Sequence, residues 1–218
     1  MAKNDENFDR IYSESLSQMT DLTDKQKNVL KAALELFSTK GYEETTSADI
    51  SKKAGVAAGT IYKKFPNKRA ILIAVLAPAF DVVLPKTVED FAKKTLQKNY
   101  TDLPTLIHTI VDDRVNFIEV NYLSLKVLIS QALNGDGEVL NAFKKEATKQ
   151  MQKYMIKTIK SFIKQGKMVD WPVSEIIAFI ISPIFGYFGK KLFGVSVDKD
   201  KEISLTTQFI VKGLTPQK

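Results

Sequence analysis

Apolar residues recur every three to four positions along most of this 218-residue chain, which is the spacing of one face of an α-helix. The clearest stripe lies in residues 23–40 and consists of Val29, Ala33, Leu36 and Phe37. The same period predicts helices over residues 68–83, 103–122, 122–133, 138–167, 175–191 and 199–214. The pattern therefore predicts an all-α protein, with Pro78 and Pro85 marking a kink or a break.

Residues 45–68 predict two short helices joined by a tight turn. The first begins behind Thr46 or Ser47, whose hydroxyl groups can cap free backbone N–H groups. It ends at Gly55, because glycine tolerates a left-handed backbone. The second spans residues 57–64 and places Ile61 and Phe65 on its buried side. This arrangement is a helix-turn-helix.

Basic residues gather on this two-helix unit. Residues 50–69 contain no Asp or Glu, and their six cations are Lys52, Lys53, Lys63, Lys64, Lys68 and Arg69. The whole chain has a net charge of +7 and a pI near 9.3, which favours an anionic partner such as nucleic acid or a membrane surface. A solvated surface face would give the same cluster, so charge alone does not decide the partner.

The segment GVAAGTIYKKFPNKRAIL resembles the DNA-binding signature of the TetR/AcrR family of bacterial transcriptional regulators. The resemblance covers residues 26–74, with matches at Ile50, Ala54-Gly55-Val56, Gly59-Thr60-Ile61-Tyr62, Phe65 and Lys68. It implies an N-terminal three-helix DNA-binding domain followed by a variable helical domain that binds a ligand and forms a dimer. It also implies a regulator, most often a repressor, that a small molecule releases from a palindromic operator.

Three domains follow from this interpretation. Residues 1–22 are expected to form a mobile N-terminal arm or a short extra helix. Residues 23–69 form the helix-turn-helix DNA-binding domain, and residues 70–218 form the ligand-binding and dimerisation domain.

The DNA-binding residues that we expect are Thr46, Ser47, Ala57, Ala58, Gly59, Thr60, Tyr62, Lys63 and Lys68. Thr60 and Lys63 would approach base edges, and Gly59 would allow close approach of the backbone. Relatives often carry Ser-Lys or similar polar residues where this chain has Ala57-Ala58. The two methyl groups donate no hydrogen bond, although alanine can contact a thymine methyl group.

Phosphate contacts are expected from Thr46, Tyr62 and Lys68. Lys68 opens a helix, whose first amide groups would also face the DNA backbone.

The predicted ligand-pocket residues are Asp113, Arg114, Phe117, Met151, Tyr154, Met155 and Phe179. Asp113 and Arg114 fall on or beside the apolar stripe of residues 103–122, where a buried charge is costly unless it is paired. They are candidates for polar groups lining a cavity, and a local ion pair is the alternative. The methionine and aromatic residues between 143 and 162 would give an adaptable pocket wall or an ordinary core.

A homodimer interface is predicted at the C-terminal end. The helix over residues 175–191 is apolar nearly all round and must be buried on several sides. The ending resembles the last two helices of TetR-like regulators, which form a four-helix interface, and we prefer this to an intramolecular core helix. The expected interface residues are Ile176, Phe179, Ile180, Ile184, Tyr187, Phe188, Phe209 and Ile210.

Catalytic and metal sites are not expected, and neither is a cofactor. The chain contains no cysteine, and its single histidine, His108, has only Asp112 as a neighbour at helical spacing. The longest nearly apolar run, residues 176–188, has 13 residues, whereas a spanning helix needs about 20. The first residues lack the apolar segment of a signal peptide, so we expect a cytoplasmic protein with no role in a membrane.

Two other functions fit part of the chain. One is a helical carrier of lipophilic ligands, which would suit the C-terminal two-thirds but leave residues 50–69 unexplained. The other is a membrane-associated protein that uses the lysine-rich residues 144–164 and binds DNA only non-specifically. Sequence-specific DNA binding would separate the regulator from both.

Overall fold

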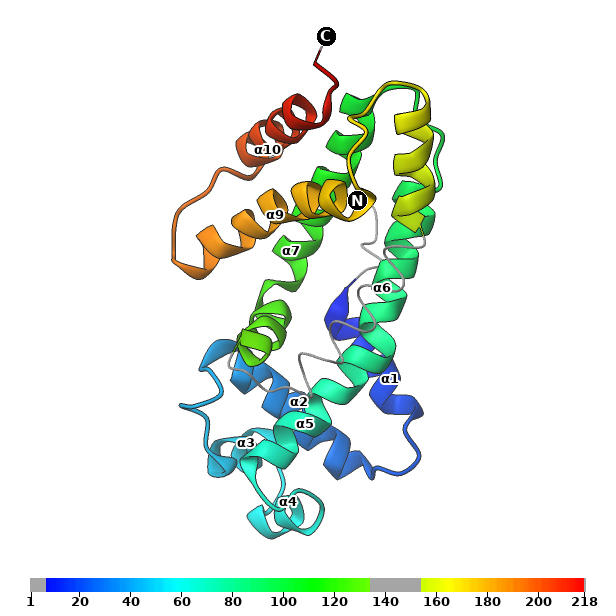
Figure 1. The fold of residues 1–218 in the computed structure, drawn as a ribbon. Coiled ribbons are helices and arrows are strands. Elements are labelled where there is room, and N and C mark those ends of the chain that lie inside the picture. Colours follow the sequence, from blue (N-terminus) through cyan, green and yellow to red (C-terminus); the bar gives the residue numbers. More distant parts are fainter. Residues whose placement is uncertain (1–6, 134–153, 218) are drawn as a thin grey trace. The chain divides into compact units, whose positions relative to one another are not determined.

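The structure is a computed structural model that describes residues 7–133 and 154–217. In these two ranges every regular element is a helix, which confirms the all-α prediction (Figure 1). The described residues form two compact units. Unit 1 contains residues 7–87 and 121–133, and unit 2 contains residues 88–120 and 154–217.

Unit 1 holds the predicted helix-turn-helix. Its helices are α1 (Phe8–Gln18), α2 (Asp24–Thr39), α3 (Ser47–Ala54), α4 (Ala58–Lys64), α5 (Lys68–Pro78), the π-helix η1 (Ala79–Val83), the start of α6 (Leu84–Phe91), and α7 (Leu103–Leu133) from residue 121 onward. Helix α2 packs against α3, α4 and α5.

Local side-chain chemistry sets the helix ends in this unit. Thr23, Thr46 and Asn67 each cap a helix with a side-chain oxygen that accepts a backbone N–H. Gly55 ends α3 with φ of +67°, in the left-handed region that glycine tolerates. These four ends are where the sequence predicts them.

The N-terminal residues 8–18 form a helix, so of the two alternatives for this segment, arm or short helix, the structure has the helix. Its apolar side chains Phe8, Ile11, Tyr12 and Leu16 are all buried. Helix α1 packs against η1, α2 and α5 and is part of the core of unit 1. The predicted boundary between an arm and a DNA-binding domain at residue 22 stays a prediction.

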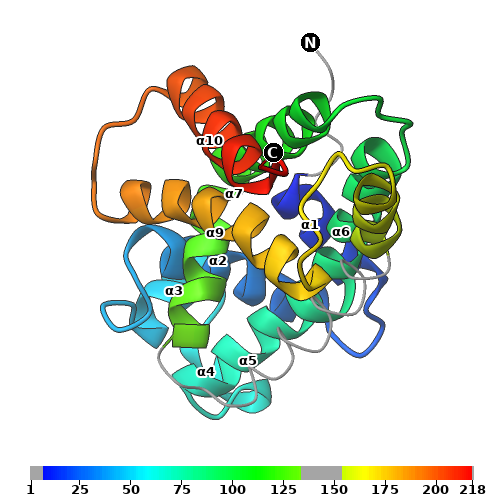
Figure 2. The ribbon, with the colours of Figure 1, turned by 45° about the horizontal axis from the view of Figure 1, so that its top comes forward.

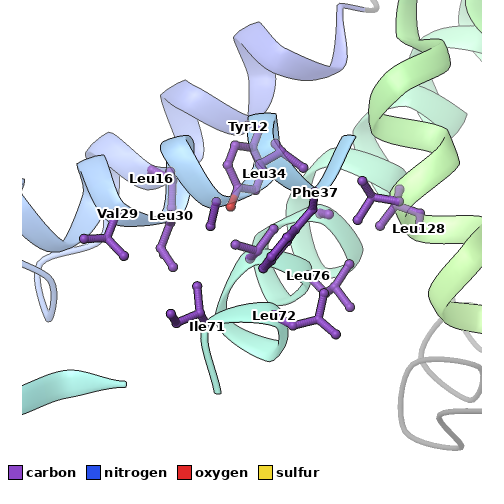
Figure 3. Packing of buried hydrophobic residues seen from close by; sticks show 14 of the residues in the cluster. Tyr12, Leu16, Val29, Leu30, Leu34, Phe37, Ile71, Leu72, Leu76 and Leu128 are labelled. Atoms are coloured by element: carbon purple, nitrogen blue, oxygen red, sulfur yellow. The ribbon is translucent and has the colours of Figure 1, made fainter. Parts of the chain in front are cut away.

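The core of unit 1 is built from apolar side chains of α1, α2, α5 and α7 (Figure 3). Phe37 of α2 lies near Leu72 and Leu76 of α5, and Leu128 of α7 lies beside the same cluster. Burying each such side chain contributes roughly 1.5–3 kcal/mol, so this cluster holds α2 and α5 together and fixes the short helices that pack on them.

Unit 2 contains the rest of α6, the π-helix η2 (Ala92–Leu96), α7 up to residue 120, a helical stretch at residues 154–164, α9 (Val173–Leu192) and α10 (Lys199–Leu214). Helices α9 and α10 lie side by side in both views (Figures 1 and 2). Of the predicted helix over residues 138–167, residues 138–153 lie outside the described residues, and residues 154–164 are helical.

The break predicted at Tyr122 is a kink in one continuous helix. Helix α7 has 31 residues, and Asn121 alone interrupts it with φ of −111° and ψ of 16°. The kink coincides with the passage of the chain from unit 2 to unit 1.

The kink predicted near Pro78 takes the form of a π-helical turn. Proline lacks the N–H that an α-helix needs at this position and crowds the preceding turn. The chain widens into η1 immediately after Pro78, and the Leu84 N–H bonds to the Ala79 carbonyl, five residues back.

By length and hydropathy alone, two helical stretches are long and apolar enough to cross a membrane, although we expect no spanning segment. One covers residues 68–96, and 56% of its most apolar window is buried inside the chain, as in a core helix. The other is α9, with only 28% buried. The exposed part of α9 is therefore apolar surface, and such surface commonly marks a site of contact with another molecule.

Candidate DNA-binding surface

Helices α3 and α4 meet at a compact turn that both backbone and side chains close. The Val56 N–H bonds to the Ser51 carbonyl at 3.1 Å, and the Ser51 hydroxyl returns a bond to the Val56 carbonyl at 2.5 Å. Ile50 of α3 and Ile61 of α4 are fully buried beneath the turn. The two helices are therefore held as one unit with their polar faces outward.

The predicted base-reading end of α4 faces solvent. Ala57, Ala58, Gly59 and Lys63 are exposed, whereas Thr60 is half-buried. Helix α4 begins after Ala57 without a side-chain cap, and the Thr60 N–H bonds to the Ala57 carbonyl at 2.8 Å. Ala57 has no side-chain cap bond, and Ala57, Ala58 and Gly59 present only small apolar groups to solvent at the start of α4.

Tyr62 is the most conspicuous side chain of this face. Its ring is 51% exposed although it lies one residue from fully buried Ile61. An exposed tyrosine combines a flat apolar ring with a hydroxyl donor, which suits contact with a sugar-phosphate backbone.

Acidic neighbours engage some of the basic residues and leave others available. Lys53 pairs with Glu35 at 2.5 Å, and Lys64 lies 3.9 Å from Asp21. Within the described ranges, Lys52 and Lys63 have no ion pair or side-chain hydrogen bond. Fewer positive charges are therefore available for phosphates than the sequence cluster indicates. Lys52 and Lys63 are among those that are available.

The start of α3 is fixed by a reciprocal capping box. The Thr46 hydroxyl accepts the Asp49 N–H at 3.1 Å, and the Asp49 carboxylate accepts the Thr46 N–H at 3.0 Å. Lys40 of the preceding turn also donates to Asp49 at 2.7 Å. This bond from Lys40, with those from Thr46, lowers the pKa of Asp49 to about 2. Exposed Thr46 and half-buried Ser47 are thereby held in a fixed position.

Lys68 has contacts that the sequence does not reveal. Its ammonium group donates to the carbonyl oxygens of Tyr42 at 2.9 Å and Glu43 at 3.1 Å, and it lies 4.3 Å from the centre of the Tyr42 ring. The carboxylate of Glu43 is 3.9 Å away. The first turn of α5 is thus tied to the loop before α3.

In unit 2, Asp113 and Arg114 form an ion pair inside the chain. Arg114 donates to the Asp113 carboxylate at 2.5 and 2.8 Å, and its guanidinium group lies 4.0 Å from the ring centre of Phe91 and 4.7 Å from that of Phe117. Lys94 approaches the second Asp113 oxygen at 3.5 Å. Of the two sequence alternatives, the ion pair is present. The pocket role of Asp113, Arg114 and Phe117 stays a prediction.

A cavity in the described part of unit 2 has a volume of about 620 Å³. Its lining residues are Leu96, Gln97, Lys98, Asn99, Tyr100, Tyr154, Lys157, Thr158, Ser161, Phe162 and Gln165. Tyr154 is the predicted pocket residue among them. Met155 is buried in the core, Phe179 is half-exposed on α9, and Met151 lies outside the described residues.

The predicted dimer residues divide into two sets. Six of them are buried within the single chain, and their place in an interface stays a prediction: Ile176, Ile180, Ile184, Tyr187, Phe188 and Ile210. Tyr187 also donates its hydroxyl to Glu119 of α7. Phe179 and Phe209 are exposed. Leu205, one helical turn before Phe209 on α10, and Phe185 of α9 are also exposed, and neither was predicted from the sequence.

Comparisons with known proteins match these features. The family model for bacterial regulatory proteins of the tetR family matches residues 29–75, from α2 into α5. The HTH-type transcriptional regulator YvkB of Bacillus subtilis (strain 168), which is uncharacterised, is 25% identical over 196 residues, covering 87% of this chain and 96% of that protein.

Two solved structures share the fold. The transcriptional regulator FadR from Bacillus subtilis, in complex with stearoyl-CoA, has a TM-score of 0.59 and 18% identity, covering 85% of this chain and 97% of that one. The ketosteroid transcriptional regulator KstR2 of Mycobacterium tuberculosis has a TM-score of 0.63 and 15% identity, covering 90% and 97%. With a helix-turn-helix that the family model matches, and a likeness that extends through the C-terminal helices, the chain belongs to the TetR family of DNA-binding transcriptional regulators.

Proposed function

We propose that this protein is a ligand-responsive repressor that binds a near-palindromic operator as a homodimer and acts in the cytoplasm. The observation that carries the proposal is the outward face of the helix-turn-helix, where Tyr62 and Lys63 are exposed beside a small, open start of α4. In a dimer, two such faces about 34–36 Å apart reach successive major grooves.

We assign Lys63 and Thr60 to base edges and Tyr62 and Thr46 to phosphates. The absence of an ion pair on Lys63 among the described residues supports its role, because no internal bond must be broken when it meets DNA. Ala57 and Ala58 would approach thymine methyl groups, and Gly59 would let the backbone come close. The capping box supports a phosphate contact at Thr46, since its hydroxyl oxygen accepts the Asp49 N–H and its proton is left to donate.

The homodimer proposal rests on apolar surface. Helices α9 and α10 expose Phe179, Phe185, Leu205 and Phe209, each about half exposed or more. Large exposed apolar groups that follow two adjacent helices favour burial against a second copy of the same helices.

The effector that we propose is a small lipophilic molecule with a polar end, bound in unit 2. The cavity lined by Tyr154 supports this, because Leu96 and Phe162 offer apolar walls while Lys98 and Lys157 can meet an anionic group. The stearoyl-CoA complex of a protein with the same fold supports a ligand of this kind. Binding would favour a conformation that fits the operator poorly and release the DNA.

Selection of bound duplexes from a random pool at physiological salt tests the proposal. We expect a palindrome, with Lys63→Met weakening binding and relaxing preference at one position in each half-site. Lys31→Met, at an exposed lysine of α2 outside the proposed surface, is the matched control and should bind as the unmodified protein does. Salt-sensitive binding without any sequence preference would instead favour a lipophile carrier or a membrane-associated protein.

A further inference from the structure

We propose that α1 is a coupling helix, which ties the helix-turn-helix, through α2, to the two helical segments by which the chain leaves unit 1. Helix α1 precedes residues 29–75, so the family match does not include it. The consequence for DNA rests on the repressor function proposed above, whereas the coupling itself is a property of unit 1.

The chain passes between the two units at two places among the described residues. One follows Thr87 in α6, about one helical turn beyond η1, and the other is at Asn121, the kink of α7. We call residues 79–87 and 121–133 the exit segments. Both continue into unit 2 as helix, so a movement in unit 2 can reach unit 1 along a rigid element.

Helix α1 contacts both exit segments. It packs against η1 of the first. At the second, the N–H of Phe8 bonds to the Asn121 side-chain oxygen at 2.7 Å, and the Ser124 hydroxyl donates to Asp9 at 2.8 Å. Asn121 and Ser124 are each only 4% exposed. A polar group that loses its partner there is not compensated by water, so these two bonds favour a docked α1.

Helix α1 also packs on the helix that supports the helix-turn-helix. Tyr12 and Leu16 lie beside Leu30 and Leu34 of α2 (Figure 3). Helix α2 in turn packs against α3 and α4. One helix of 11 residues therefore contacts α2 and both exit segments.

The docking of α1 can be lost on its own. As the first helix of the described chain, α1 can detach while α2 and α5 stay folded, which is a local opening. Its apolar face favours docking, but the Tyr12 hydroxyl is buried and has no hydrogen-bond partner within residues 7–133 and 154–217. A buried hydroxyl without a partner lowers the stability of the docked state. Helix α1 is therefore held less firmly than its burial alone indicates.

Docking of α1 should matter most for a whole palindrome. The two helix-turn-helix units of a dimer must keep one separation to reach successive major grooves. When α1 detaches, η1 loses its packing and α7 loses two hydrogen bonds, so the exit segments hold each helix-turn-helix less firmly. Each unit would still bind its own half-site, but the two would engage together less often.

Affinity for the selected palindrome and for one isolated half-site tests the coupling. For Phe8→Ala in the full chain we expect about tenfold weaker binding to the palindrome and less than about twofold change at the half-site. Ser124→Ala, which removes one bond to α1, should show a smaller loss of the same kind. Glu14→Ala, at an exposed position of α1, is the matched control and should bind as the unmodified protein does.

Two outcomes would overturn the proposal. Equal losses at the palindrome and the half-site in Phe8→Ala would mean that α1 only supports the fold of the helix-turn-helix. An unchanged affinity for the palindrome would mean that DNA binding does not need a docked α1.

A variant of opposite sense sharpens the test. Tyr12→Phe removes the hydroxyl that has no partner and keeps the ring, so α1 should dock more firmly and its amides should exchange more slowly. We expect its affinity for the palindrome to equal or exceed that of the unmodified protein. Slower exchange together with weaker binding to the palindrome would contradict the coupling.

Hydrogen exchange in the DNA-free protein decides the coupling without an operator. We expect Phe8→Ala to speed exchange in α1, in η1 and in residues 122–128, and to leave α3 and α4 unchanged. Faster exchange confined to α1 would overturn the coupling. If no operator can be selected, the proposed repressor fails, yet this measurement still shows whether α1 holds the exit segments.

Discussion

At the scale of single residues, Asp49 shows how one carboxylate can serve two elements. It closes the capping box of α3 and accepts a bond from Lys40 at the end of α2. These bonds lower its pKa to about 2 from an ordinary value of 3.8. Because the pKa is lower in the folded than in the unfolded chain, ionised Asp49 stabilises the fold above about pH 4, and this contribution is lost as the pH falls towards 2.

We therefore expect acid to loosen the start of α3. Carbon NMR titration of the Asp49 carboxyl group should give a pKa near 2, and the urea midpoint should fall between pH 4 and pH 2 more steeply in the unmodified protein than in Asp49→Asn. Asp24→Asn, in the first turn of α2 but outside its capping box, is the control. Equal pH dependence in unmodified and Asp49→Asn proteins would contradict this role.

Residue spacing explains which local features the sequence can predict. Thr46, Gly55 and Asn67 act on backbone groups within three residues or so, so their cap roles follow from the local sequence. The partners of Lys68 lie 25 and 26 residues away, and only the folded chain brings them together. For the same reason the sequence could not reveal that Lys53 is paired with Glu35 while Lys63 is not.

At the scale of helices, the apolar periodicity predicts where a helix forms better than it predicts which neighbour the helix packs against. The stripes of α2, α5, α9 and α10 identify these helices, but the stripe of a helix does not say which partner covers it. Helix α9 is apolar nearly all round, and pattern alone could not separate the buried Ile180 and Tyr187 from the exposed Phe179. The packing of α1 was likewise hidden, because its four buried side chains sit in a polar sequence.

The kink of α7 is the element-scale feature with the clearest consequence. Asn121 is 4% exposed, and its side-chain oxygen accepts the N–H of Phe8, the first residue of α1, at 2.7 Å. Ser124 adds a bond to Asp9 at 2.8 Å. The first turn of α1 has N–H groups without helical partners, so Asn121 caps α1 from another helix.

Replacing Asn121 by leucine should leave the buried Phe8 N–H without its acceptor. We expect a loss of about 1–3 kcal/mol in the free energy of unfolding, with α1 exchanging its amides faster than α2. Urea unfolding and hydrogen exchange measure both effects. Asn116→Leu, on the same helix in unit 2, is the control: it removes only exposed hydrogen bonds, to Asp112 and Lys199, and should change the unfolding free energy by only about 0.5 kcal/mol. Equal losses in the two variants would show that the bond to α1 is not what matters.

At the scale of the whole molecule, the proposed regulator depends on the exposed faces of α9 and α10. Phe209 is 65% exposed and Phe179 50%, although both are large and apolar. The buried residues of the same helices already pack inside unit 2. A second copy would therefore bury the exposed apolar residues on the outer side of these helices. Most of the residues predicted for the interface are buried inside the single chain, whereas Phe179 and Phe209 are exposed, and the interface itself stays a prediction.

A charge placed on this face should separate the subunits. We expect Phe209→Asp to be folded but monomeric at micromolar concentration by sedimentation, because an aspartate buried in an apolar interface is unpaired. Its affinity for a palindromic operator should fall far more than its affinity for an isolated half-site, since only the dimer engages both half-sites at once.

Ser204→Asp is the matched control, because Ser204 is exposed on α10 but lies to the side of the face that Leu205 and Phe209 form. It should remain dimeric and bind the operator as the unmodified protein does. A Phe209→Asp protein that stays dimeric would move the interface away from α10, and a monomeric unmodified protein would remove the dimer. Loss of the dimer together with unchanged operator affinity would instead show that one helix-turn-helix is enough for recognition, and the operator would then need no palindrome.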